Sequence, residues 1–98
     1  MTFLTEKEQT AIDFLANQGL DCMGGEGKAD LKSDNMSWFN IKDLMTGMGL
    51  NRHEAAGIMS ALDAKGLASD QEAGSTVRYD RDSWCLNDAG IDAARIPE

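Results

Sequence analysis

One histidine and two cysteines are the side chains best suited to bind a metal ion in this 98-residue sequence. Cys22 and Cys85 lie 63 positions apart, with His53 between them. Zinc sites usually bring their ligands in closely spaced pairs and require a fourth donor. Because the sequence offers neither, we predict no metal site. We interpret both cysteines as reduced packing residues.

A glycine-rich segment from Gly24 to Ala29 has the composition of a phosphate-binding loop. That motif needs a glycine where this sequence has Cys22 and a metal-binding hydroxyl where it has Ala29. The segment therefore predicts a flexible loop over about residues 21–36. No nucleophile, base and orienting acid form a recognisable group either. We thus expect a protein that is not an enzyme, has no catalytic residues and needs no cofactor.

The net charge is −8, from 17 acidic and nine basic residues with the histidine neutral. Proteins that bind DNA draw much of their affinity from lysine and arginine side chains that neutralise phosphates. A chain this acidic meets repulsion from a duplex unless its basic groups gather on one face. The remaining acidic groups are typical of a solvated surface, and a surface that mimics nucleic-acid charge is the alternative.

Length and composition favour one domain over residues 1–98. The sequence is 42% hydrophobic and 27% charged with one proline, which is ordinary for a globular protein. No stretch approaches the 18 apolar residues of a membrane span, and the first residues do not resemble a signal peptide. We therefore expect a cytoplasmic protein that does not interact with a membrane.

Capping boxes predict the starts of three helices. Thr5 with Glu8 begins a helix over about residues 5–18, and Gly19 stands where a left-handed cap is expected. Asn40 begins a second helix that runs to Gly49, and Asn51 begins a third after only a tight turn. The third helix ends at the segment Lys65-Gly66-Leu67. The inward side of the third helix consists of apolar residues at helical spacing: Ala55, Ile58, Met59 and Leu62.

Short strands are predicted at residues 37–39, 67–72 and 78–86, and the last two pair as an antiparallel hairpin. Asn87 then begins a closing helix that ends near Ala94. The element order is α-β-α-α-β-β-α, which is an α+β fold.

Two stretches of this sequence resemble winged helix-turn-helix repressors of the multiple-antibiotic-resistance (MarR-like) type. The first runs from Ile41 to Leu67 and ends in Leu62-Asp63-Ala64-Lys65-Gly66-Leu67, similar to the end of the recognition helix in that family. The second, Trp84 to Gly90, is similar to the strand that returns from the wing, with Asn87 where that family commonly has threonine. The resemblance covers about residues 37–95 and implies a small winged helix.

In that family the exposed side of the third helix enters the major groove of DNA and the wing touches the backbone. The resemblance thus implies binding residues on the third helix and in the wing: Arg52, His53, Gly57, Ser60, Arg78 and Arg81. Residues 51–66 have a net charge of zero, and residues 67–86 a net charge of −2. A surface that binds the phosphate groups of DNA is usually basic, and neither of these segments is.

Two functions therefore remain open at this point. One is a transcriptional regulator that binds double-stranded DNA, with a symmetric homodimer or a larger partner supplying much of the affinity. The other is an acidic winged-helix module that docks onto a protein partner through the third helix, the wing or the loop from Asp21 to Asn35, and does not bind DNA itself. Near that loop, four apolar residues form either a contact patch or a cluster packed beneath the glycine-rich segment: Met23, Met36, Trp38 and Phe39.

Overall fold

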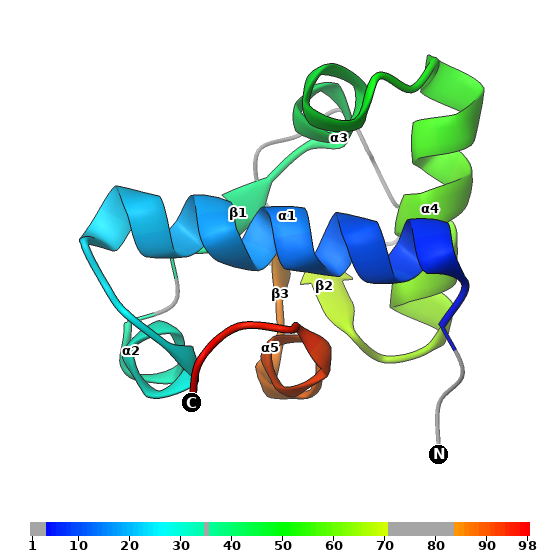
Figure 1. The fold of residues 1–98 in the computed structure, drawn as a ribbon. Helices are drawn as coiled ribbons and strands as arrows, with labels where there is room; N and C mark the ends of the chain where they lie inside the picture. Colours follow the sequence, from blue (N-terminus) through cyan, green and yellow to red (C-terminus); the bar gives the residue numbers. More distant parts are fainter. Residues whose placement is uncertain (1–3, 35, 71–83) are drawn as a thin grey trace.

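A computed structural model describes residues 4–34, 36–70 and 84–98. These residues form helices and a three-stranded antiparallel sheet, which confirms the α+β prediction. In Figure 1, α1 crosses the middle of the molecule, with α3 above it, α4 upright beside its N-terminal end, and α2 and α5 below it. The elements in chain order are α1 (Glu6–Met23), α2 (Lys28–Ser33), β1 (Trp38–Phe39), α3 (Ile41–Met48), α4 (Arg52–Ala64), β2 (Ala68–Asp70), β3 (Trp84–Leu86) and α5 (Asp88–Ala93).

Helix α1 begins at the predicted capping box but continues for more than a turn beyond the predicted end. The Thr5 hydroxyl accepts a hydrogen bond from the backbone N–H of Glu8, and the Glu8 carboxylate accepts one from the N–H of Thr5. The left-handed cap is Gly24, with φ of 69°, and not Gly19. A Cβ at Gly19 would lie 3.1 Å from the backbone of Ser37, so this glycine permits close packing.

The prediction of a loop over residues 21–36 is wrong for two parts of that segment. Residues 21–23 complete α1, and Lys28–Ser33 form the additional helix α2. Leu31 is fully buried there and packs against α1 at Gly19. Sequence periodicity missed α2 because six residues with one buried side chain give no repeating pattern.

The helix-turn-helix of α3 and α4 agrees closely with the prediction. Asn40 and Asn51 cap the two helices with reciprocal capping boxes through Asp43 and Glu54. Gly49 ends α3 in the left-handed conformation, with φ of 65°. The tight turn that follows fixes the direction in which α4 leaves α3.

The sheet has the order β1-β3-β2, with β3 in the centre. Ala68 pairs with Leu86, and Trp38 pairs with Cys85, both in antiparallel register. The two predicted hairpin strands therefore pair in their described part. The rest of the two predicted strands and the turn predicted between them fall within residues 71–83, which lie outside the described residues.

The core is formed by apolar side chains from α1, the sheet and the four other helices, with Trp84 and Phe39 the largest that are fully buried. Cys85 belongs to the buried residues, as predicted, but Cys22 is exposed in the last turn of α1. The packing role expected for Cys22 is therefore wrong. Among the described residues, no helix is both long and apolar enough to cross a membrane.

Candidate docking face on α4

Local hydrogen bonds set where α4 begins. The Asn51 side chain accepts a hydrogen bond of 2.8 Å from the N–H of Glu54, and the Glu54 carboxylate accepts one of 3.2 Å from the N–H of Asn51. The N–H of Leu50 donates to the carbonyl of Met45 across the turn at 3.0 Å. Since these bonds lie within ten residues, the position of α4 relative to α3 is encoded locally.

The side of α4 that faces away from the core carries small or uncharged side chains. Ala55, Ile58, Met59 and Leu62 are buried and define the inward side. At about 100° per residue, the centre of the opposite side falls on residues that are all exposed: His53, Gly57, Ser60 and Ala64. Three of the six residues predicted for binding therefore share one exposed stripe, and no carboxylate lies on it.

Gly57 lies in the middle of this stripe, and no side chain projects from the helix there. A Cβ built on Gly57 meets no atom within 4 Å, whereas one built on Gly47 in α3 would lie 2.1 Å from Cζ of Phe14. Gly47 is thus explained by packing against α1, but no contact with another described residue explains Gly57. A helix backbone without a side chain at this point can be approached closely by another molecule.

Two cations of the helix-turn-helix have no ion-pair partner among the described residues. They are Lys42 in the first turn of α3 and Arg52 at the first position of α4, and both are exposed. The other described cations pair with carboxylates: Lys7 with Glu54, Lys28 with Glu98, Lys32 with Asp92, Lys65 with Glu8 and Arg95 with Asp13. A cation in the first turn is opposed by the helix dipole, so these positions do not serve the stability of the helices.

Arg52 is among the binding residues predicted from the sequence, but Lys42 is not. The position of Lys42 in the first turn of a capped helix is readable from the sequence. That no described carboxylate pairs with Lys42 is not readable from the sequence, because the ion pairs of the other cations mostly join distant parts of the chain. The ammonium group of Lys7, for example, lies 3.7 Å from the carboxylate of Glu54. Glu54 is the carboxylate nearest to Arg52 in the sequence, and it is therefore already paired.

Lys65 at the end of α4 is held by Glu8 in the first turn of α1. Burial alone would raise the pKa of Glu8, but hydrogen bonds from Lys65 and Thr5 outweigh it and lower the pKa below the ordinary value of 4.5. The carboxylate therefore stays ionised at neutral pH. This partly buried pair fixes the end of α4 against α1 and removes Lys65 from the candidate docking face.

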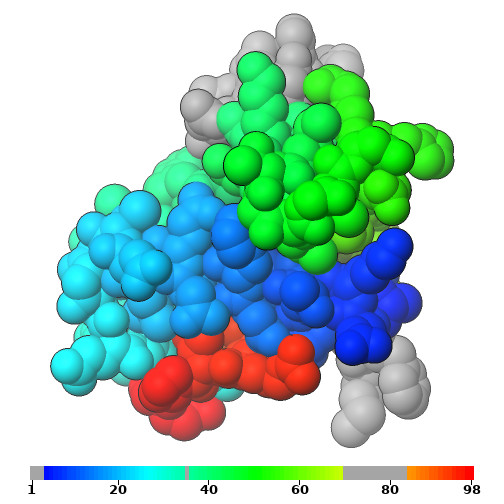
Figure 2. All heavy atoms as spheres, turned by 45° about the horizontal axis from the view of Figure 1, so that its top comes forward, coloured from blue at the N-terminus to red at the C-terminus, as the bar shows by residue number. Residues whose placement is uncertain are grey.

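Charge is distributed unequally on the two sides of α1. Residues 40–66, which contain α3 and α4, carry three basic and three acidic side chains. Residues 17–34 and 87–98, which contain α2 and α5, together carry seven acidic and three basic side chains. Figure 2 shows α3 and α4 in green on one side of α1 and the C-terminal segment in red on the other. These two segments around α2 and α5 therefore carry −4 of the net charge of −8, whereas the helix-turn-helix is neutral.

Two of the predicted binding residues, Arg78 and Arg81, lie outside the described residues. Of the predicted site, the structure places His53, Gly57 and Ser60 on one exposed side of α4, and Arg52 is exposed at the first position of the helix. Within the described ranges, no group of three histidine, cysteine, aspartate or glutamate side chains is arranged to hold a metal ion, and no pocket is present.

The apolar patch considered from the sequence is divided between the surface and the core. Trp38 and Met36 are 44% and 38% exposed, whereas Phe39 is only 1% exposed. The alternation of side chains along β1 explains the difference between the two neighbouring aromatic residues. Met23 packs against the core. The exposed part is therefore limited to Met36 and Trp38.

Comparison of this chain with protein-family profiles, with curated proteins and with solved structures finds no match.

Proposed function

We propose that this chain is a non-enzymatic winged-helix module that docks on double-stranded DNA and regulates transcription. The face that would meet the duplex is the exposed side of α4 together with the first turns of α3 and α4. The observation that carries the proposal is that Lys42 and Arg52, in the first turns of α3 and α4, have no ion-pair partner among the described residues, while the exposed stripe of α4 itself holds no carboxylate. Phosphate groups are the partners that exposed cations and helix N-terminal N–H groups favour.

The distribution of charge supports this orientation. An acidic protein can approach DNA if its negative groups lie on the far side, because the interaction between exposed charges decays over about 8 Å at physiological salt. The acidic side chains around α2 and α5 lie across α1 from α4. In the proposed complex they would face solvent, and the neutral helix-turn-helix would face the duplex.

The side chains of the stripe on α4 favour DNA binding with little specificity for base sequence. Strong base contacts come mainly from arginine, lysine, asparagine and glutamine side chains that form paired hydrogen bonds. The stripe offers only His53 and Ser60 as hydrogen-bonding side chains, since Gly57 and Ala64 have none. We therefore expect contacts to phosphate to supply most of the affinity, with a symmetric homodimer strengthening it.

A salt titration of binding to a duplex of mixed sequence tests this proposal. Lys42→Ala and Arg52→Ala should each weaken binding and reduce the slope of log K against log salt by about 0.9, the value expected for one lost phosphate contact. Lys32→Ala is the matched control. It also removes one positive charge, but from a lysine of α2 that is paired with Asp92 and does not belong to the proposed face. Absence of binding at about 50 mM salt and micromolar protein would reject DNA as the partner.

A second candidate function is docking onto a protein, which the net charge of −8 and the exposed Trp38 favour. Gly57 offers a way to separate the two functions, because any side chain added there enters open space. If DNA is the partner, Gly57→Lys should strengthen binding and Gly57→Asp should abolish it. If a protein packs closely against the helix, both variants should weaken its binding, since both fill the shallow surface.

A further inference from the structure

Helix α2 is held in place by residues from the other end of the chain. It has six residues, and Leu31 is its single buried side chain. An isolated helix of this length is unstable in water, because the cost of the first turn is not recovered. No side chain among the described residues caps its start at Gly27. Its stability must therefore come from tertiary contacts.

The carbonyl groups of the last two residues cap the start of α2. The N–H of Lys28 donates to the carbonyl of Pro97 at 2.7 Å, and the N–H of Ala29 donates to the carbonyl of Glu98 at 3.4 Å. The N–H groups in the first turn of a helix have no acceptor within the helix, so they otherwise donate to a side chain or to water. The backbone of residues 97–98 thus replaces the missing N-cap side chain.

Side chains reinforce the same contact. The Lys28 ammonium group donates to the carbonyl of Asp92 at 2.8 Å and lies 3.3 Å from the Glu98 carboxylate. The Lys32 ammonium group lies 2.5 Å from the Asp92 carboxylate. Both lysines of α2 are therefore engaged by residues 92–98.

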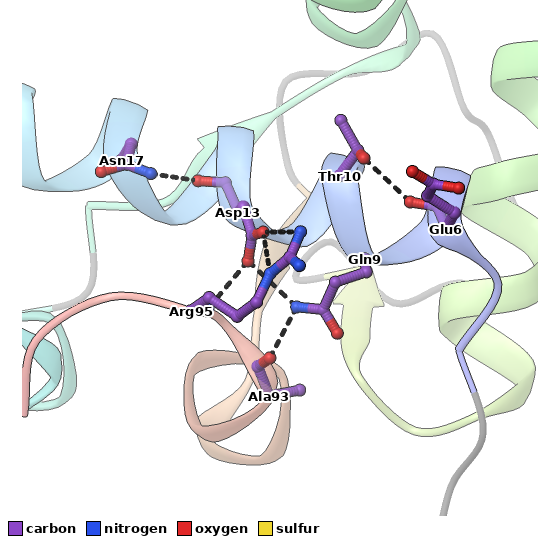
Figure 3. A network of polar contacts seen from close by, with 7 residues as sticks. All are labelled: Glu6, Gln9, Thr10, Asp13, Asn17, Ala93 and Arg95. Carbon is purple, nitrogen blue, oxygen red and sulfur yellow. Dashed lines mark hydrogen bonds and ion pairs between the residues drawn. The ribbon is translucent and has the colours of Figure 1, made fainter.

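The same C-terminal residues are anchored on α1. The backbone N–H and the guanidinium group of Arg95 donate to the Asp13 carboxylate, each at 2.8 Å, and Gln9 donates to the carbonyl of Ala93 at 2.8 Å. Figure 3 shows these groups converging between α1 and the end of α5. Ile96, the residue after Arg95, is buried. Residues 92–98 therefore bridge α1 and α2.

Glycines connect α2 to α1. Gly24 ends α1 in the left-handed conformation, and Gly27 immediately precedes α2. Glycine-rich backbone rotates more easily than other sequences. The hydrogen bonds of the connection are local, from the N–H of Gly25 to the carbonyl of Leu20 in α1 and from the N–H of Glu26 to the Asp30 carboxylate in α2. Beneath α2, Leu31 covers the part of α1 at Gly19. Movement of α2 would expose this apolar surface on the side of α1 away from α4.

We infer that residues 92–98 form a strap that holds α2 closed over α1, and that α2 opens as a lid when the strap is released, while α1, α3, α4 and the sheet stay folded. The opening is a local unfolding step with its own equilibrium. It is independent of the proposed DNA-binding function, because the strap and the α4 face lie on different sides of α1.

Gly27→Ala tests the strap directly. The added Cβ would lie 2.6 Å from the carbonyl oxygen of Pro97, which forces the strap away without changing charge. The φ of Gly27 is −165°, an extended conformation that alanine adopts, so the backbone itself is not strained. Gly57→Ala is the matched control, because its Cβ enters open space.

Hydrogen exchange measured by NMR gives the readout. In Gly27→Ala, the amides of Leu31 and Asp34 should exchange at least about tenfold faster, as expected for the loss of one or two hydrogen bonds. The amides of Met59 and Leu62 in α4 should keep their rates. Unchanged rates in α2, or an equal acceleration in α2 and α4, would overturn the inference.

Lys28→Met provides a second test that retains the fold if Gly27→Ala does not. It removes the ammonium contacts to Asp92 and Glu98 but keeps the apolar stem of the side chain. Lys7→Met is its control, since it breaks an ion pair with Glu54 that lies outside the strap. Faster exchange in α2 for Lys28→Met alone supports the strap, and equal exchange in the two variants contradicts it.

Discussion

The helix-turn-helix and the α2 region form their helices in opposite ways. Helices α3 and α4 each begin at a capping box within four residues, and a left-handed glycine follows each of them. Helix α2 has no side-chain cap among the described residues, and its first N–H groups bond to Pro97 and Glu98. Helices with local caps, such as α3 and α4, do not need a distant contact in order to form. Helix α2 depends on its contact with residues 97–98.

The two regions also differ in how much apolar surface they bury. Helix α4 contributes four buried side chains to the core, and α2 contributes one. Hydrophobic burial is the main source of stability, so α4 belongs to the cooperative unit of the protein. Helix α2 belongs to its periphery. Three sets of variants sharpen this contrast.

The largest difference is expected between two buried leucines. Leu62 in α4 and Leu31 in α2 are both fully buried. Leu62→Ala should lower the free energy of unfolding by about 2–5 kcal/mol in a urea titration. Leu31→Ala should lower it by less, because α2 can open locally before the core unfolds. Equal losses in the two variants would place α2 within the cooperative core and break the comparison.

A smaller effect is expected from the carboxylates that connect α1 to each region. Glu8 contacts Lys65 at the end of α4, and Asp13 contacts Arg95 in the strap. Burial alone would raise the pKa of Asp13, but hydrogen bonds from Arg95 and Gln9 lower it below the ordinary value of 3.8. Groups with lowered pKa stabilise the fold above their unfolded pKa, and this stability is lost as the pH falls through the folded pKa.

We therefore expect the free energy of unfolding to decline below about pH 4.5. Glu8→Gln and Asp13→Asn should each be less stable at pH 7 by about 1.5–3 kcal/mol, the range for a hydrogen bond to a charged group. Both variants should also decline less steeply in acid. Circular dichroism melts from pH 7 to pH 2 measure this, and acid profiles parallel to that of the unaltered protein would contradict it.

The smallest effect is expected for two exposed glycines of the helix-turn-helix. Gly57→Ala should raise the free energy of unfolding by about 0.5–1 kcal/mol, because alanine favours the helix and its Cβ meets no atom. Gly47→Ala should give no such gain, since its Cβ would lie 2.1 Å from the ring of Phe14. Thermal melts of both variants give the answer, and destabilisation by Gly57→Ala would show that the α4 face is not open.

The sequence predicted the helix-turn-helix well because its signals are short-range. Asn40, Asn51 and the glycines that end the helices act within one turn of the residues that they cap. The same reasoning placed the end of α1 at Gly19, because a glycine at a helix end and a glycine at a close contact look alike in a sequence. Only the approach of Ser37 distinguishes the two roles.

The candidate site was predictable in part. Helical spacing alone places His53, Gly57 and Ser60 on one side of α4, and the buried residues of the helix confirm which side is exposed. Lys42 was not predictable as a member of the face. Its role depends on which cations are already paired, and that in turn depends on contacts between separate helices.

The sequence by itself determined where α3 and α4 begin and end, which of their sides is apolar, and how much charge the chain carries. Hydrogen bonds and side-chain spacing within a few residues are sufficient to fix those properties. Tertiary structure alone decided that α2 exists, that five of the described cations are paired, and that two acidic segments from opposite ends of the chain meet around α2 and α5. Those properties arise because folding brings residues from distant parts of the chain within bonding distance, and no local pattern records which partners will meet.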